Sequence, residues 1–205
     1  MALATYSNLT AAVAAWLNRS DLTAVIPDFV TLAEGKIARD LRLSAQIAST
    51  TLTTVAGNQG VTLPSDLLEI ENLTLTSTSP PGALSVVTPE ILDRKYPVNY
   101  ATGQPVVYAP IGTQLLFGPT PDAAYTVSLV YFQRFTALST TPTNWLLTNY
   151  PSIYLFGTLA EAAGYMMDPQ ASAMWTQRYG QECDALQLKD DTALRSGSAM
   201  RVRTL

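Results

Sequence analysis

The sequence of 205 residues contains no histidine and only one cysteine. The absence of histidine excludes His-based catalytic triads, Cys/His dyads, His metal ligands and the usual proton carrier near neutral pH. A single cysteine, Cys183, excludes an internal disulfide and a Cys-rich zinc site. Cys183 falls in the apolar stripe of a predicted helix, and this position favours a thiol in the core over a reactive one.

Charged side chains are also scarce: they make up 14% of the sequence, whereas 47% of the residues are hydrophobic. A soluble domain usually has about a quarter of its residues charged. The deficit predicts that some apolar surface is buried against other subunits. The net charge of −4 argues against a general nucleic-acid-binding protein, because contacts with phosphates require clustered Lys and Arg.

The sequence lacks a hydrophobic run long enough to cross a membrane. The most apolar segment, residues 152–167, would form a helix of about 24 Å. Tyr150-Pro151 and Asp168-Pro169 bound this segment before the roughly 20 apolar residues that a bilayer requires. A helix that is apolar on all sides is either deeply buried or lies between subunits. The N-terminus lacks the basic region and apolar run of a secretory signal, which predicts synthesis in the cytoplasm.

Motifs for catalysis or cofactor binding are missing as well. The glycines are spaced as turn formers, and the sequence has no GxGxxG, GKS or GKT motif. Glu69 and Glu71 lie two residues apart on a predicted strand, whereas a glycosidase uses carboxylates from separate elements that face one substrate. We therefore expect a protein that is not an enzyme and that binds neither a cofactor nor a metal ion.

Helical periodicity is clear at both ends of the sequence. Apolar residues recur every three or four positions in residues 7–18, with Ser7 available as a cap, and again in a helix that Pro27 begins. Residues 144–188 indicate two consecutive helices, and Asp168 can cap the second of them. Between about residues 51 and 142 the helical period disappears.

The middle of the sequence has the composition of strands. Thr, Val and Leu alternate there with turn residues, as is typical of a β-rich domain. Strands are expected at residues 84–87, 106–109, 114–117 and 125–135, with a short helix after Thr88-Pro89.

The simplest architecture is an α+β fold in which a helical bundle made from both ends of the chain carries an inserted β-rich domain. Residues 1–50 and 143–190 form the bundle, residues 51–142 form the insertion, and residues 191–205 form an extended C-terminal arm. Beyond Asp191 the arm has no acidic residue. Its arginines and apolar residues alternate as Arg195, Met200, Arg201, Val202, Arg203 and Leu205.

Large side chains in the C-terminal helices are candidates for a subunit interface, because aromatic residues carry a large share of binding energy. For any one of them, packing in the core of a single subunit is the favoured interpretation. Trp145 is the strongest interface candidate, since it lies between the predicted insertion and the bundle. The interface or core candidates are Trp145, Tyr154, Leu159, Trp175 and Tyr179.

Several short motifs occur together along residues 5–190. The clearest part runs from Asn144 through Tyr150-Pro151 to Leu159-Ala160-Glu161-Ala162-Ala163 and Tyr179. The other motifs are Ile26-Pro27-Asp28-Phe29, Leu32-Ala33-Glu34, Arg39-Asp40-Leu41-Arg42, Leu63-Pro64-Ser65-Asp66 and Gly118-Pro119-Thr120-Pro121. In this pattern the chain resembles the head-to-tail adaptor, or connector, proteins of tailed bacteriophages, particularly short-tailed ones.

The resemblance implies a helical bundle with a β-rich insertion that forms a ring, usually of twelve copies. It implies that the ring attaches to the portal protein at the capsid vertex through the arm and presents its other face to tail or nozzle proteins. Double-stranded DNA would pass through the lumen without sequence-specific binding. The protein would be made in the host cytoplasm and would end in the virion between head and tail, without contact with a membrane.

Two other function classes stay open at this point. A β-rich receptor- or glycan-binding accessory protein of a tail would account for the insertion, with the Tyr-rich residues 96–108 as its platform, but it leaves the apolar helices unexplained. An enzyme that uses carboxylates and tyrosines has the weakest support, because the sequence shows no convergent site.

Overall fold

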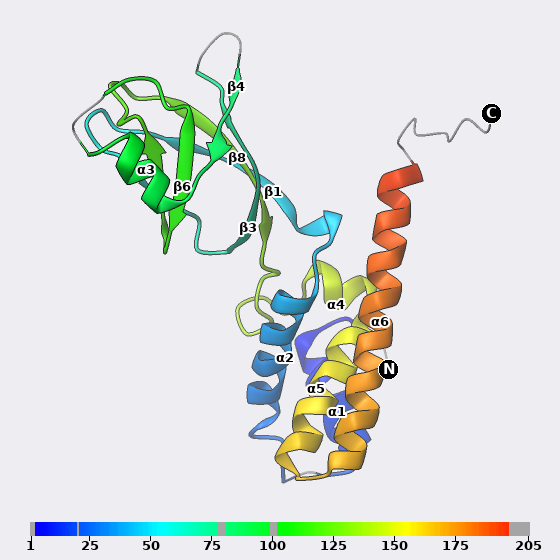
Figure 1. Cartoon of the computed structure of the whole chain (residues 1–205). Helices are drawn as coiled ribbons and strands as arrows, with labels where there is room; N and C mark the ends of the chain where they lie inside the picture. The colour runs from blue at the N-terminus through cyan, green and yellow to red at the C-terminus, as the bar shows by residue number, and fades with distance from the viewer. Residues whose placement is uncertain (1–2, 20, 78–80, 99–101, 197–205) are drawn as a thin grey trace, which may run out of the picture. The chain divides into compact units, whose positions relative to one another are not determined.

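The computed structural model describes residues 3–19, 21–77, 81–98 and 102–196. The chain divides into two compact units, one formed by Met1–Ala45 with Phe135–Leu205 and the other by Gln46–Arg134. In Figure 1 the blue N-terminal helices and the yellow to red C-terminal helices make up the first unit, and the cyan to green middle of the chain makes up the second. We call them the helical unit and the β unit. The predicted α+β class is confirmed.

The units meet along the chain at residues 45–46 and 134–135, whereas the sequence pattern placed these boundaries at 51 and 142. The first shift arises because the strand begins at Ile47, which pairs with Phe132. The second arises because Leu138 is buried in the core of the helical unit, and its N–H donates to Glu34 Oε1 at 2.8 Å. Residues 135–142 therefore belong with the helices.

Helix α1 (Tyr6–Leu17) begins one residue before the expected Ser7. Its cap is Thr5, whose Oγ1 accepts from the Asn8 N–H at 3.3 Å, so the cap predicted at Ser7 is wrong. Helix α2 (Ile26–Asp40) carries Pro27 in its first turn, as expected, and has no side-chain cap.

The C-terminal segment forms three helices, one more than the periodicity predicted: α4 (Trp145–Asn149), α5 (Pro151–Tyr165) and α6 (Pro169–Ser196). Proline at position 151 separates α4 from α5, because it has no N–H to continue the ladder. The predicted cap of α6 is confirmed, since Asp168 Oδ1 accepts from the N–H groups of Gln170 and Ala171 at 3.1 and 3.0 Å.

Helix α6 also corrects the start of the C-terminal arm. Residues 191–196, expected to be extended, continue the helix to Ser196, and Thr192 Oγ1 donates to the Leu188 carbonyl at 2.7 Å. The segment contains neither Gly nor Pro before Gly197, so no residue in it ends the helix early. Residues 197–205, with Met200, Arg201, Val202, Arg203 and Leu205, lie outside the described residues.

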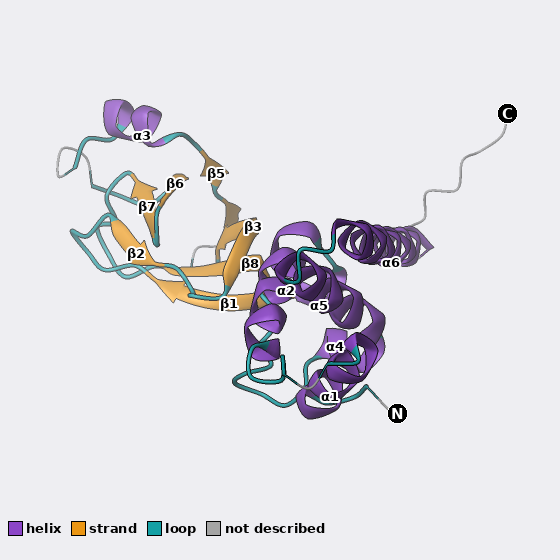
Figure 2. Ribbon diagram, turned by 90° about the horizontal axis from the view of Figure 1, so that it is seen from below, coloured by secondary structure: helices purple, strands orange, loops and turns teal. Residues whose placement is uncertain are grey.

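The core of the helical unit forms around α5. Figure 2 shows α5 surrounded by the other helices of the unit. At Gly157 the helices approach closely: an added Cβ would lie 3.4 Å from Ala33 of α2 and 3.4 Å from Tyr179 of α6. No helix in the described ranges is both long and apolar enough to cross a membrane.

In the described part of the chain the β unit contains two four-stranded sheets. The first has the order β1 (Ile47–Thr53), β8 (Thr126–Gln133), β3 (Leu67–Leu75) and β4 (Gly82–Ala83). The second has the order β2 (Gly60–Thr62), β7 (Gln114–Gly118), β6 (Val107–Ile111) and β5 (Ser85–Val86). Buried residues of both sheets, among them Leu73, Phe117 and Leu129, form one core between them. The predicted short helix is α3 (Pro89–Lys95), with Thr88 as its cap.

Candidate interaction surfaces

Tyr154 and Leu159 of α5 lie in the core of the helical unit. The Tyr154 hydroxyl accepts from Asn144 Nδ2 at 2.7 Å, and the Tyr154 carbonyl accepts from Thr158 Oγ1 at 2.7 Å. Burial raises the pKa of Tyr154 well above its ordinary value. Packing within one subunit thus explains why α5 is apolar. The apolar composition of α5 does not by itself require a contact with another subunit.

Tyr179 of α6 is also buried, and its hydroxyl donates to Asp40 Oδ2 of α2 at 3.2 Å. Burial is the main cause that raises the pKa of Tyr179. One turn further along α6, Cys183 is buried, and its surroundings raise the pKa of the thiol to about 11. The prediction of a core thiol is confirmed, since a thiol with so high a pKa reacts slowly at neutral pH.

Trp175 belongs to an aromatic cluster that also contains Trp16 of α1 and Phe156 of α5. The ring centroids lie 5.6 Å apart for Trp16–Trp175, 5.8 Å for Phe156–Trp175 and 6.3 Å for Trp16–Phe156. The Arg178 guanidinium lies 5.2 Å from the Trp175 ring centroid. Trp16 is 51% exposed. Tryptophan and arginine are enriched among the residues that carry most of the binding energy at protein interfaces. This partly exposed cluster is therefore a candidate contact surface.

Trp145 is 43% exposed at the start of α4. Its ring stacks on Phe135 with 6.0 Å between centroids and 7° between planes, and it also contacts Tyr150. The Tyr150 hydroxyl accepts from Lys189 Nζ of α6 at 2.9 Å. One face of Trp145 therefore packs within the helical unit, and the rest of the ring is available to a partner.

A second apolar position of the helical unit lies on α2, where Leu32 is 56% exposed. Its helical neighbours Asp28, Thr31 and Gly35 are also exposed, so this side of α2 has no cover within the described residues. Leu32 therefore lies exposed on a different helix from the residues of the aromatic cluster, which belong to α1, α5 and α6.

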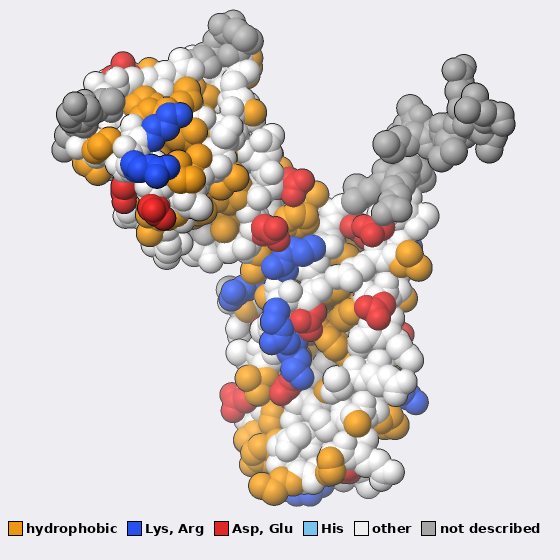
Figure 3. Space-filling model, viewed as in Figure 1, with side chains coloured by type: hydrophobic (Ala, Val, Ile, Leu, Met, Phe, Trp, Pro, Cys, Tyr) orange, Lys and Arg blue, Asp and Glu red, His pale blue; other side chains and the backbone are white. Residues whose placement is uncertain are grey.

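A groove of about 410 Å³ runs between α2, α5 and α6. Lys36 forms a half-buried ion pair with Glu161 of α5 next to it. Figure 3 shows basic side chains in a row along this side of the helical unit, interspersed with acidic ones. The groove is lined by Lys36, Arg39, Asp40, Gly157, Ala160, Thr176, Tyr179 and Gly180. Of these side chains, Tyr179 and Asp40 are hydrogen-bonded to each other, and burial raises the pKa of Tyr179, which disfavours the ionised form that would act as a nucleophile.

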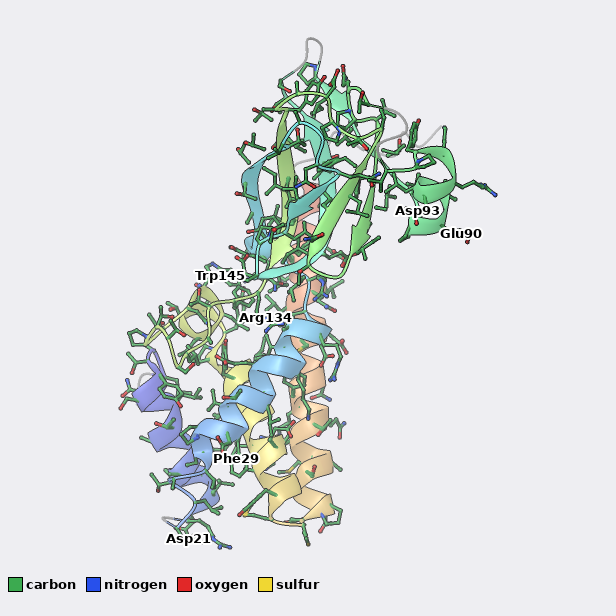
Figure 4. The ribbon with its side chains drawn as sticks, turned by 90° about the vertical axis from the view of Figure 1, so that its left-hand side faces the viewer. Asp21, Phe29, Glu90, Asp93, Arg134 and Trp145 are labelled. Carbon is green, nitrogen blue, oxygen red and sulfur yellow. The ribbon has the colours of Figure 1, made fainter. Side chains whose placement is uncertain are left out.

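The carboxylates of the β unit do not converge on a catalytic site. Glu69 and Glu71 are exposed on β3. Glu90 and Asp93 lie on α3, whose charged side chains are exposed to solvent (Figure 4). Among the residues that the structure describes, no group of three or more His, Cys, Asp or Glu side chains is arranged to hold a metal ion.

Within the Tyr-rich residues 96–108, the tyrosines that the structure describes do not form an exposed platform of the kind that a glycan-binding protein would need. Tyr108 is buried in the core of the β unit, and Tyr96 is half-buried, with Lys95 Nζ 5.5 Å from its ring centroid. Tyr100 lies outside the described residues. The described tyrosines therefore give the receptor- or glycan-binding alternative no support.

The candidate arm is described only at its first residues. The backbone of Arg195 is helical, as part of α6, and its side chain lies outside the described part of the chain. The surface found in the structure but missed from the sequence is the exposed side of α2 around Leu32. Periodicity assigns residues to one face of a helix but does not show which neighbours cover that face.

Comparison with known protein families places the whole chain in one group. The model of the SU10 adaptor protein family matches residues 4–203, which include both the helical unit and the β unit. No curated protein matches the sequence. The resemblance to head-to-tail adaptors is thereby confirmed: the chain belongs to the SU10 adaptor protein family, and it is a structural adaptor protein of a phage virion.

Proposed function

We propose that the protein forms a ring, of twelve copies in a short-tailed phage, that joins the portal to the tail and continues the DNA channel. The observation that carries this proposal is the family match over residues 4–203, which spans both units. The protein acts by its geometry and assembly, and no catalytic step is involved.

The ring is built through the helical unit. A closed ring of more than two copies needs two different faces on each subunit, one for each neighbour. The aromatic cluster around Trp16 and the side of α2 around Leu32 supply two such faces, each with an apolar side chain more than half exposed. Burying both faces in every copy also accounts for a sequence in which 14% of the residues are charged.

The C-terminal arm binds the portal. Arg195, Arg201 and Arg203 are suited to carboxylates of the portal, because the guanidinium is planar and permanently charged. Met200, Val202 and Leu205 add apolar contacts between them. The β unit lies on the tail side and binds tail or nozzle proteins.

Double-stranded DNA passes through the lumen of the ring without sequence-specific contacts. A strongly basic wall would hold the duplex through its phosphates and would slow ejection. The net charge of −4 fits a wall that is neutral or acidic.

Photo-cross-linking of the assembled portal, adaptor and tail complex with a diazirine reagent, followed by mass spectrometry, tests these assignments, because residues 192–205 contain no Lys, Asp or Glu side chain for a conventional cross-linker. We expect links from residues 192–205 to the portal and links from residues 46–134 to tail proteins. Links that run mainly from residues 46–134 to the portal would reverse the proposed orientation.

A further inference from the structure

The first sheet of the β unit ends in a strand whose outer edge is long and regular. Strand β1 pairs with β8 over seven consecutive residues without a register shift, and in the described residues it pairs with no other strand. Figure 2 shows β1 at the margin of its sheet. Its sequence, IASTTLT, contains neither a charged residue nor proline. Natural proteins usually protect such an edge with charges, prolines, bulges or very short strands.

The hydrogen bonds fix which backbone groups face outward. The N–H of Thr54, one residue beyond β1, donates to the Tyr125 carbonyl at 3.0 Å, so Thr54 faces β8. Because orientation alternates along a strand, Leu52 and Thr50 also face β8, whereas Ser49, Thr51 and Thr53 face away.

The opposite strand gives the same result. The Thr126 carbonyl, directly across from Thr53, accepts from the Thr76 N–H at 2.9 Å and therefore faces β3 rather than β1. The N–H and carbonyl groups of Ser49, Thr51 and Thr53 thus point out of the sheet. They form a row of donors and acceptors at the spacing of an extended backbone.

The other sheet edges in the described part of the chain do not offer such a row. Strands β2 and β5 are three and two residues long. The part of β3 that lies beyond β4 has two register shifts and carries Glu69 and Glu71. Among the described sheet edges, a second copy therefore presents only its own β1 as a match, and pairing of two β1 strands gives a two-fold dimer, not a ring.

We infer that β1 binds an extended segment of a tail protein, which adds to the first sheet as a fifth strand. Main-chain hydrogen bonds give the affinity in this mode of binding, and alternate side chains give the specificity. The inference rests on the proposed function, in which the β unit meets the tail.

The surroundings of β1 define the chemistry of the segment. Ala48 and Leu52 are half-buried at the rim of the core, so apolar residues at alternate positions of an added strand extend that core. The β unit has six acidic residues against three basic ones, counted over residues 46–134. Electrostatic complementarity then selects a neutral or basic segment over an acidic one.

Amide hydrogen exchange of the full-length adaptor, with and without the purified tail complex of the same virion, tests the inference. In the adaptor alone we expect fast exchange at Ser49, Thr51 and Thr53 and slow exchange at Thr50 and Leu52. Addition of the tail complex should slow exchange at Ser49, Thr51 and Thr53 at least tenfold, roughly the effect of one backbone hydrogen bond. Fast exchange at these amides in the bound state would overturn the inference.

The Thr51→Pro variant removes one outward donor and places its ring on the outer edge, while no hydrogen bond to β8 is lost. Thr51→Val is the matched control, because it keeps the amide. We expect attachment of the tail complex to weaken roughly tenfold with Thr51→Pro and to stay unchanged with Thr51→Val. Equal attachment of both folded variants would contradict a strand addition, and the exchange measurement decides if Thr51→Pro does not fold.

The outcomes separate this inference from the proposed function. Tail binding without protection of β1 would reject the added strand and leave the adaptor function intact. Absence of tail binding by the wild-type protein would contradict both. Protection of β1 in the adaptor alone would show that a second copy, through β1 or through residues 197–205, occupies the edge instead.

Discussion

Asn144 joins three parts of the helical unit through one side chain. Its Oδ1 accepts from the Leu147 N–H at 2.9 Å and so caps α4. Its Nδ2 donates to the Thr136 carbonyl at 2.9 Å and to the Tyr154 hydroxyl at 2.7 Å. The sequence indicates the cap, since Asn precedes an apolar run, but the contacts of Nδ2 depend on tertiary packing that no local pattern shows.

The Asn144→Ala variant should lose about 2–3 kcal/mol of unfolding free energy, because a cap is lost and the Tyr154 hydroxyl remains buried without its donor. Tyr154→Phe should lose about 1 kcal/mol. Urea denaturation of the single and double variants measures both losses. The double variant should lose less than the sum, since the two substitutions remove the same hydrogen bond. Strict additivity would show that Asn144 and Tyr154 do not interact.

The buried thiol of Cys183 links stability to pH. Its pKa is raised from 9.0 to about 11, mainly by burial, so the folded state holds the proton more tightly than the unfolded state. The stability that the protonated Cys183 thiol contributes is fully present below about pH 9 and is lost as the pH rises towards 11.

Between pH 8 and pH 10 the wild-type protein should lose about 1 kcal/mol more stability than Cys183→Ala. Urea midpoints at the two pH values measure this difference. Tyr154 acts in the same direction in both proteins and cancels in the comparison. The pKa of Tyr179 is raised mainly by burial, which both proteins share, and to a smaller extent by Cys183, so its contribution cancels only in its main part. An identical loss in both proteins would contradict the assignment.

At the scale of single elements, local chemistry predicts the start of a helix where an acceptor side chain precedes a proline. Asp168 was identified as a cap from the sequence, and the short helix was placed after Thr88-Pro89, because an acceptor side chain before a first-turn proline is a strong local signal. The end of α6 and the start of β1 were not identified. Neither Gly nor Pro occurs in residues 191–196 or 47–50. Their secondary structure therefore follows that of the helix or strand to which they are joined.

Gly118, at the end of β7, allows α3 to pack onto the second sheet. A Cβ there would lie 2.6 Å from Leu92 Cδ1 of α3 and 2.8 Å from Tyr96 Cδ2. Gly118→Ala should destabilise the β unit by about 1–3 kcal/mol, the usual cost of overpacking. Gly82→Ala is the control, since nothing lies within 4 Å of its added Cβ. Equal thermal unfolding of the two variants would show that α3 moves without cost.

Truncation of the C-terminal segment tests the proposed arm. Removal of residues 192–205 should leave the thermal transition nearly unchanged, because Asp191 and the two residues after it are exposed at the end of α6. Portal binding should fall sharply. Truncation after Ser196 is the matched control that keeps the end of the helix. Co-sedimentation with the portal at physiological salt measures binding, and normal binding by both truncated proteins would reject the arm.

At the scale of the molecule, the α+β class and the insertion were predictable because periodicity changes twice along the chain. Helical patterns at both ends and a strand pattern between them leave few other arrangements. The sequence did not show which of the candidate residues lie in the core and which stay exposed. Tyr154, Leu159 and Tyr179 proved to be core residues, while Trp145 and Trp16 keep about half of their surface exposed. Aromatic residues serve both purposes, so only the packed structure distinguishes them.

The central claim is that copies of this protein form a ring on the portal. Electron microscopy of the purified protein, imaged alone and mixed with its portal, tests it most directly. We expect a closed ring of adaptor density, coaxial with the portal and with an open central channel. Portal particles that stay bare, or that carry adaptors without rotational symmetry, would contradict the account.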